Sequence, residues 1–144
     1  MNSGVKAYNQ VAVQTGVNDA SPHRLIQMLL DAALEKIAKA KGFMLNRKVQ
    51  DKGENIGLAI SIIDVLRASL DMQAGGEISQ NLESLYDYMT RRLTEANLKN
   101  DVMLLDEVTN LLVPIKQAWD ALPQEVRDAH QQQAQGNKEQ AAAG

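Results

Sequence analysis

Apolar residues recur at helical spacing along most of this chain, and they rarely alternate as they do in a β-strand. The first clear pattern begins at Ser21-Pro22, where serine can cap a helix and proline fits its first turn. Its apolar stripe continues from Leu25 to Met44, and residues 46–51 are mostly polar. We therefore expect a first long helix that begins at Ser21-Pro22 and ends near Met44.

The next helix is expected over about residues 51–73, and apolar residues cover much of its circumference. One stripe consists of Ile56, Ala59, Ile60, Ile63, Leu66 and Leu70. A second stripe, on an adjacent face, consists of Leu58, Ile62, Val65 and Met72. This pattern favours either a central position in the fold or a groove that is covered. Gly75-Gly76 is expected to end this helix, because glycine adopts the left-handed cap conformation cheaply.

Two further helices are expected after the glycine pair, separated by a polar turn at residues 97–101 with Asn100 as a cap. The stripe of the third helix, about residues 77–98, is Ile78, Leu82, Leu85, Met89, Leu93 and Ala96. The stripe of the fourth is Leu105, Val108, Leu112, Ile115 and Trp119. Pro114 falls inside the fourth pattern, so we expect a kink or a local loosening there.

Short turns between long helices predict an all-α fold, an antiparallel four-helix bundle, over residues 21–122. Residues 1–20 form a separate N-terminal segment, which carries a short apolar stripe and could cap a groove on the bundle. Residues 123–144 are expected to form a short C-terminal helix and a disordered Gln/Ala-rich tail.

Composition excludes several classes of function. The chain has 144 residues, a formal net charge of −3 and no cysteine. The charge argues against a nucleic-acid binder, and the lack of cysteine excludes disulfides, zinc–thiolate sites and a thiol nucleophile. The first ten residues do not resemble a signal peptide, and no apolar run is long enough for stable membrane insertion. We expect a protein of the reducing cytosol.

No group of residues has the spacing of a catalytic or metal site. A di-iron bundle needs Glu-x-x-His pairs, and neither of the two histidines follows a glutamate by three positions. His23 is interpreted as a solvated surface histidine, Asp106-Glu107 as solvated charges near a helix start, and Arg91-Arg92 as members of surface ion pairs. Gly75-Gly76-Glu77 lacks both the strand and the Lys-Ser/Thr of a phosphate-binding loop. We expect neither an enzyme nor a cofactor.

A helical protein with more apolar surface than one core needs, and without reactive groups, is most simply a binder of other helices. Tyr86 and Tyr88 cannot both face the core, because two residues span about 200° of a helix. One of the two rings is therefore available as an anchor for a partner. The residues that we expect to bind a partner are Val5, Tyr8, Leu58, Ile62, Val65, Tyr86, Tyr88 and Met89.

An ordered set of motifs resembles the flagellin-specific export chaperone family FliS from Val5 to about Trp119. The motifs are Val5-Lys6-Ala7-Tyr8, Ser21-Pro22-His23, Lys52-Gly53-Glu54, Ala59-Ile60, Ile62-Ile63, Leu70-Asp71, Gly75-Gly76-Glu77, Asn81-Leu82, Leu85-Tyr86, Tyr88-Met89, Arg91-Arg92-Leu93, Ala96-Asn97 and Asn100-Asp101. None of these pieces is diagnostic alone, but their order is specific. Pro114 and the Gln-rich tail have no clear counterpart in the family.

The resemblance implies a chaperone of the bacterial cytosol that binds the C-terminal helical segment of flagellin and prevents its premature polymerisation. It also implies that the chaperone–client complex is delivered to the flagellar type III export gate protein. Val5 and Tyr8 match family positions that regulate client binding and contact with the gate. The alternative, from the residues alone, is a helical regulatory module that self-associates, and a weak homodimer is left open.

Overall fold

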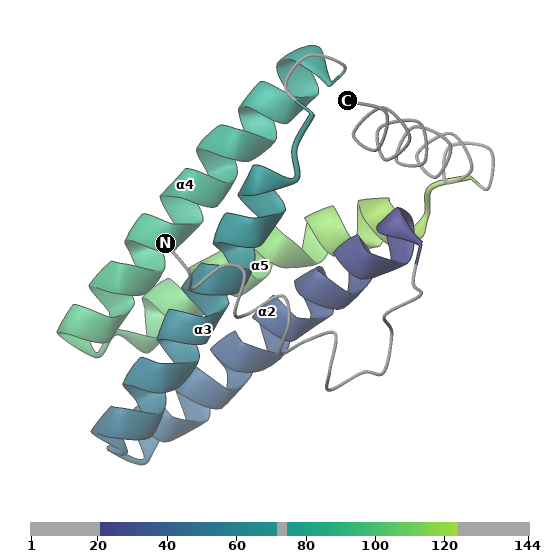
Figure 1. Cartoon of the computed structure of the whole chain (residues 1–144). Coiled ribbons are helices and arrows are strands. Elements are labelled where there is room, and N and C mark those ends of the chain that lie inside the picture. Colours follow the sequence, from purple (N-terminus) through teal and green to yellow (C-terminus); the bar gives the residue numbers. More distant parts are fainter. Residues whose placement is uncertain (1–20, 72–74, 124–144) are drawn as a thin grey trace, which may run out of the picture.

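The computed structural model describes residues 21–71 and 75–123, and these form four α-helices joined end to end (Figure 1). The helices are α2 (Pro22–Leu45), α3 (Val49–Ala68), α4 (Gly76–Lys99) and α5 (Val102–Asp120). Consecutive helices run in opposite directions, and the described residues contain no strand. The prediction of an all-α helical bundle is confirmed. The expected N-terminal segment, C-terminal helix and tail lie outside the described residues, apart from Pro123.

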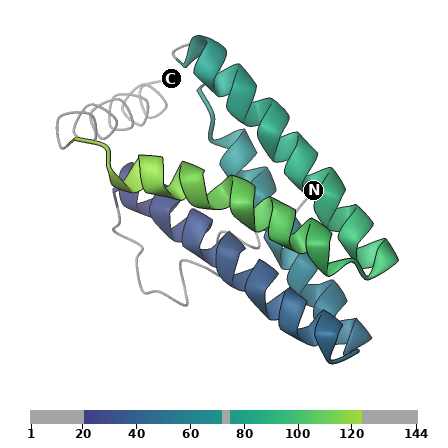
Figure 2. The same cartoon turned by 180° about the vertical axis from the view of Figure 1, so that it is seen from behind.

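The four helices surround one core as a ring. α2 packs against α3 and α5, and α4 packs against the same two helices, whereas the backbones of the diagonal pairs stay more than 8 Å apart between Cα atoms. Figures 1 and 2 show that the helices converge at the end that carries the α2–α3 and α4–α5 turns. Towards the opposite end, the α2–α5 pair diverges from the α3–α4 pair. We call the convergent end the turn end and define it as residues 45–49 and 98–103.

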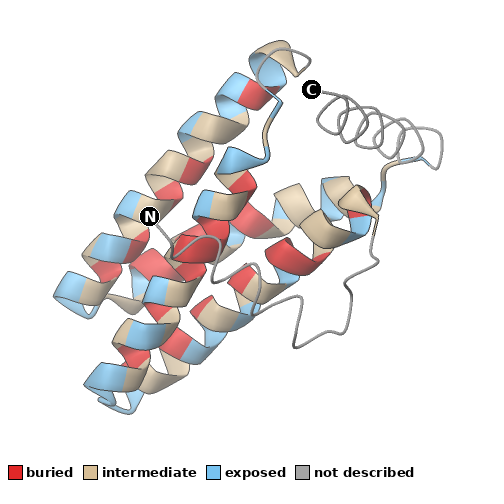
Figure 3. Ribbon diagram, viewed as in Figure 1, coloured by how far each residue is buried: buried red, intermediate tan, exposed pale blue. Residues whose placement is uncertain are grey.

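Aliphatic side chains from all four helices fill the core, as the scarcity of aromatic residues requires. Each of the four helices carries residues coloured as buried in Figure 3. Its largest fully buried members are Leu30, Ile37, Ile56, Ile62, Ile63, Leu66, Met89, Leu93, Leu105, Val108 and Leu112. Most of these belong to the stripes that the sequence predicts. α5 runs from Val102 to Asp120 without a break at Pro114, whose side chain is exposed.

The helix ends follow local chemistry. Ser21 Oγ accepts a hydrogen bond from the Arg24 amide at 3.2 Å, as expected for an N-cap. Asp101 caps α5 by accepting from the Met103 amide at 2.9 Å. Asn100 ends α4 in the left-handed conformation with φ of 52°, which asparagine tolerates better than most residues. The cap expected at Asn100 is confirmed, and it belongs to the C-terminus of α4.

The expected role of Gly75-Gly76 is wrong, because α3 already ends at Ala68. The Ser69 amide donates to the carbonyl oxygens of Val65 and Leu66, and Ser69 Oγ donates to the Leu66 oxygen at 2.7 Å, so serine closes the helix. The glycines begin α4 instead. Gly75 is its N-cap, and Gly76 has φ of 52°.

Close packing explains why residue 75 is glycine. A Cβ atom at Gly75 would overlap Ser79 Oγ and would lie 2.8 Å from the Asp71 carbonyl oxygen. Ser79 Oγ donates to that same oxygen at 2.9 Å, which ties the start of α4 to the chain that follows α3. The contact therefore needs a residue without a side chain.

Two further expectations are corrected by the packing of helix ends. His23 is buried, because the start of α2 lies against the end of α5. Its ring stacks on the Trp119 indole at 5.0 Å between centroids, and Trp119 Nε1 donates to the His23 carbonyl oxygen at 2.9 Å. Ile78, which was assigned to the core stripe, is 72% exposed. Arg67 at the end of α3 is level with Glu83, so Ile78 extends beyond α3.

A buried lysine holds the two turns of the turn end together. Lys52 lies in the first turn of α3, and its Nζ donates to the Asn97 carbonyl oxygen at 3.0 Å and to Asn100 Oδ1. The α2–α3 turn and the α4–α5 turn are therefore fixed side by side. A buried cation is tolerated here because two of its three donors bond to oxygen atoms.

Ion pairs connect three of the four pairs of neighbouring helices. Lys41–Asp106 and Lys116–Asp31 join α2 to α5, and Arg92–Glu107 joins α4 to α5. Arg67 joins α3 to α4. Among the described residues of α2 and α3, no ion pair joins these two helices, and the residues that they bury are mainly aliphatic.

Candidate functional site

Apolar side chains of α3 extend beyond the arc that faces the core, on both flanks of the helix. Ile56, Ala59, Ile63 and Leu66 are buried and mark the centre of the arc. Leu58 and Val65 lie on one flank, and Ile60 lies on the other, about 200° from Leu58 at about 100° per residue. These three side chains are half-buried. α3 therefore presents more apolar surface than the core uses.

The flank with Leu58 and Val65 faces away from α4. The two residues are seven positions apart, so their side chains point in nearly the same direction two turns apart. Val65 packs against the edge of the core, and both side chains keep an exposed part. This flank offers a short apolar strip beside α2.

Ile62 was expected on the same surface, but the structure places it in the core, with 1% of its side chain exposed. It lies one turn from both Ala59 and Leu66, which brings it within the core-facing arc. We predicted a position on the flank for Ile62 because Leu58, Ile62 and Val65 lie at regular helical spacing. The three side chains spread over a wide arc of the helix surface, and that of Ile62 points towards the core.

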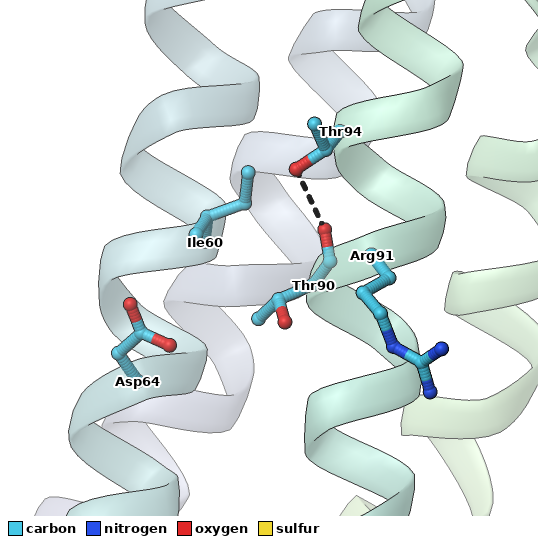
Figure 4. A pocket seen from close by; sticks show the side chains of 5 residues that line it. All are labelled: Ile60, Asp64, Thr90, Arg91 and Thr94. Atoms are coloured by element: carbon cyan, nitrogen blue, oxygen red, sulfur yellow. Dashed lines mark hydrogen bonds between the residues drawn. The ribbon is translucent and has the colours of Figure 1, made fainter.

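The opposite flank of α3 borders an open cleft of about 320 Å³ between α3 and α4 (Figure 4). Ile60 and Asp64 form the α3 side, and Thr90, Arg91 and Thr94 form the α4 side. The threonine hydroxyl groups donate to carbonyl oxygens one turn back in α4, at 2.9 Å each. They therefore present mainly their methyl groups to a ligand. Sequence reasoning missed this cleft, because Ile60 was assigned to the core.

Charged side chains close the α3–α4 contact next to the cleft. Arg67 donates to Glu83 at 2.9 Å and to Asp87 at 3.3 Å, and Arg91 pairs with Asp87 at 3.1 Å. Partial burial raises the pKa of Asp64 above its usual value, and the nearby Arg67 charge opposes this shift. The expectation that Arg91 and Arg92 form surface ion pairs is confirmed. Around the cleft, the ion pairs of Arg67 with Glu83 and Asp87 hold α3 against α4.

The three residues predicted on α4 have different environments. Tyr86 and Met89 are buried in the core, and burial raises the pKa of the Tyr86 hydroxyl to about 12. Tyr88 is half-buried at the contact with α5, where its hydroxyl donates to Glu107 at 3.1 Å. The expectation that only one of Tyr86 and Tyr88 faces the core is confirmed. Tyr88, however, lies on the α4–α5 contact and not beside Leu58 and Val65.

Acidic residues near the start of α5 are bonded and not simply solvated, which corrects the interpretation of Asp106-Glu107. Asp106 accepts from Lys41 at 2.8 Å, and Glu107 accepts from Arg92 at 2.6 Å. The hydrogen bond from Arg92, and secondarily that from Tyr88, lowers the pKa of Glu107. The Arg92 guanidinium also lies over the Tyr88 ring, 5.7 Å from its centroid.

The structure describes six of the eight residues that were predicted to bind a partner. Val5 and Tyr8 lie outside the described residues, so their placement stays a prediction. Within residues 21–71 and 75–123, no group of three metal-ligating side chains comes together. None of the described helices is long and apolar enough to cross a membrane.

Comparison with known proteins gives a consistent result. The family model for flagellar protein FliS matches residues 4–126. The flagellar secretion chaperone FliSB of Pseudomonas aeruginosa is 49% identical over 118 residues, covering 82% of this chain and 94% of the relative. The FliS chaperone of Salmonella typhimurium is 51% identical over 81% of this chain and 87% of its own length. That of Vibrio cholerae is 42% identical over 87% of this chain and 92% of its own length.

Proposed function

This chain belongs to the FliS family of flagellar secretion chaperones, and we propose that its client is the C-terminal helical segment of flagellin. Binding would cover the apolar face of that segment before assembly and so prevent premature polymerisation. The chaperone–client complex would then be delivered to the flagellar export gate protein. No step of this function requires a reaction at the chaperone.

The observation that carries the proposal is the surplus apolar surface of α3. An amphipathic segment can be bound by laying its apolar face along such a surface, as helix or as extended chain. Leu58 and Val65 offer this surface on one flank of α3, and Ile60 offers it on the other. Ordering a disordered client costs several kcal/mol, so a long apolar contact is needed to hold it. Two flanks on one rigid helix support such a length.

Charged substitutions on the two flanks test the proposal. We expect Leu58→Glu and Ile60→Glu to weaken binding of a flagellin C-terminal peptide at least tenfold in isothermal titration calorimetry, because each buries a charge against an apolar client. Ala118→Glu, at an exposed position of α5, is the matched control. Circular dichroism melts verify that each variant is folded. Unchanged affinity in both flank variants would contradict the assignment of the client surface to α3.

The N-terminal segment is proposed to regulate access to this surface. Val5 and Tyr8 are the apolar anchors of the segment, and they would compete with the client for an apolar flank. Deletion of residues 1–15 is expected to change the affinity or the association rate for the flagellin peptide, measured by calorimetry and surface plasmon resonance. If neither quantity changes, the segment does not gate the site. A full-length chain that self-associates but binds no flagellin would instead support the alternative of a self-associating module.

A further inference from the structure

Exposed aliphatic side chains gather at the turn end of the bundle. Among the described residues, five large apolar side chains are more than three-fifths exposed. Ile78 is at the start of α4, and the other four belong to the turn end: Leu45 (64%), Val49 (68%), Leu98 (82%) and Met103 (77%). The helices end in pale blue there in Figure 3. Exposed aliphatic side chains do not contribute to the packing of the core, and a group of them at one end indicates a surface that contacts another molecule.

The turn end is rigidly built, which distinguishes it from a frayed helix terminus. Lys52 fixes the two turns to each other through Asn97 and Asn100. The α2–α3 turn is also closed by backbone hydrogen bonds, from the Arg47 amide to the Met44 oxygen at 3.2 Å and from the Lys48 amide to the Phe43 oxygen at 2.9 Å. The four exposed side chains are therefore presented on a fixed frame.

Positive charge accompanies these apolar side chains. The turn end carries Arg47, Lys48 and Lys99 against one carboxylate, Asp101, so its formal charge is +2 in a chain of −3. Lys99 pairs with Glu95, whereas Arg47 and Lys48 form no ion pair with any described residue. The opposite end carries the carboxylates Asp71, Glu77 and Asp120 together with the cations Arg24, Arg67 and Lys116, and Lys116 pairs with Asp120. At the turn end, the exposed cations Arg47 and Lys48 therefore lie beside the exposed apolar side chains.

The backbone at Arg47 adds a separate observation. Its φ is 58°, in the left-handed region that side chains other than asparagine and glycine rarely adopt. Glycine would close this turn at lower cost. The turn instead presents a guanidinium group between two exposed aliphatic residues, Leu45 and Val49. Strained residues of this kind often belong to contact sites.

We propose that the turn end docks reversibly on an anionic lipid bilayer surface. Leu45, Val49 and Met103 would enter the interface, while Arg47 and Lys48 would lie at the level of the lipid phosphates. Apolar and basic groups together provide the two signals that peripheral binding needs. The docking is independent of the client surface proposed above on α3. It requires no spanning helix, in agreement with the described helices.

A lipid surface fits these residues better than an acidic protein partner does. Protein interfaces are anchored mainly by tryptophan, tyrosine and arginine side chains that fill pockets, and of these the turn end carries only Arg47. The turn end is formed by two helix–helix turns, and residues 45–49 and 98–103 contain no aromatic residue. A fluid bilayer needs no matching shape and accepts aliphatic side chains of any arrangement. Attraction of Arg47 and Lys48 to the headgroups would orient the bundle with its turn end towards the bilayer.

Sedimentation with large unilamellar vesicles tests the proposal. The full chain is mixed with equimolar phosphatidylglycerol–phosphatidylcholine vesicles or with pure phosphatidylcholine vesicles. We expect binding only to the anionic vesicles and a loss of binding at high salt. The double variant R47Q/K48Q should bind about twenty-five-fold more weakly, at roughly fivefold for each cation removed. Leu45→Asn with Val49→Asn should weaken binding at least tenfold.

Matched controls separate this surface from others. Ile78→Asn removes a similarly exposed aliphatic side chain at the opposite end of the bundle and should leave vesicle binding unchanged. All variants should keep the affinity for flagellin peptide measured by calorimetry, so that the two proposals fail separately. The lipid proposal is overturned by absence of anionic-vesicle binding, by equal binding to neutral vesicles, or by an equal loss in Ile78→Asn. Binding of a synthetic acidic amphipathic peptide without vesicle binding would overturn it in favour of a protein partner.

Discussion

The division of α3 into a core-facing arc and two flanks predicts that neighbouring apolar residues respond very differently to truncation. Ile62 is 1% exposed, so Ile62→Ala would leave a cavity among well-packed side chains. Such changes cost about 2 to 5 kcal/mol, and we expect about 3 kcal/mol here. Ile62→Val should cost about 1 kcal/mol. Leu58 is half-buried, so Leu58→Ala should cost only about 1 kcal/mol.

Urea unfolding and thermal melts followed by circular dichroism measure these differences. A loss of 3 kcal/mol corresponds to a decrease in Tm of about 10 °C for a chain of this size. Flagellin-peptide affinity, measured on the folded variants, should change in the reverse order, with Leu58→Ala affected most. A small change in stability of Ile62→Ala together with a large loss of affinity would contradict the assignment of Ile62 to the core-facing arc of α3, because Ile62 would then belong to the client surface.

Three other predictions concern the turns and the ion pairs. Arg47→Gly should raise the free energy of unfolding by about 0.5 kcal/mol, because glycine relieves the left-handed strain at φ 58° by more than it raises the entropy of the unfolded chain. Arg47→Ala should not raise the free energy of unfolding, because alanine keeps that strain. Gly75→Ala should lower the free energy of unfolding by about 2 kcal/mol in urea titrations, because the new Cβ displaces Ser79 Oγ from the Asp71 oxygen. Gly57→Ala is the control: the space around its Cβ is open, so it should not lower that free energy. Glu107 has a pKa lowered chiefly by Arg92, so its stabilising contribution is present above its unfolded pKa of about 4.5 and is lost as pH falls through the lower folded value. In Glu107→Gln, the decrease of the urea midpoint between about pH 5 and about pH 3 should therefore be smaller, and an unchanged decrease would contradict the role of the pair.

Helical periodicity was sufficient to predict the number of described helices, their order and most core positions. Ser21-Pro22 marked a helix start because the capping chemistry is local to those residues. The end of α3 was mispredicted because Ser69, a weak terminator by sequence, bonds back to Leu66, while the glycine pair serves the next helix. The apolar pattern continued through Leu70 and hid this end.

The binding surface was predicted less well because it depends on which neighbours cover each flank. Leu58, Ile62 and Val65 follow one another at helical spacing, four and then three positions apart, yet only Ile62 is buried completely. The cleft at Ile60 exists because the opposite residues of α4 include two threonines and an ion-paired arginine. Likewise, His23 is buried by Trp119, which is 96 positions away. The spacing of residues within one helix does not show which distant residues of the chain will bury them.

The apolar contact between α2 and α3 has a consequence for how the bundle responds to ionic strength. Added salt screens Lys41–Asp106, Arg67–Glu83 and Arg92–Glu107, which lie at the other three contacts between neighbouring helices. The same salt does not weaken aliphatic packing. Amide hydrogen exchange in concentrated sodium chloride should therefore accelerate first in α4 and α5. The amides of the α2–α3 hairpin would stay protected longest, so α4 and α5 would unfold from this hairpin and refold onto it.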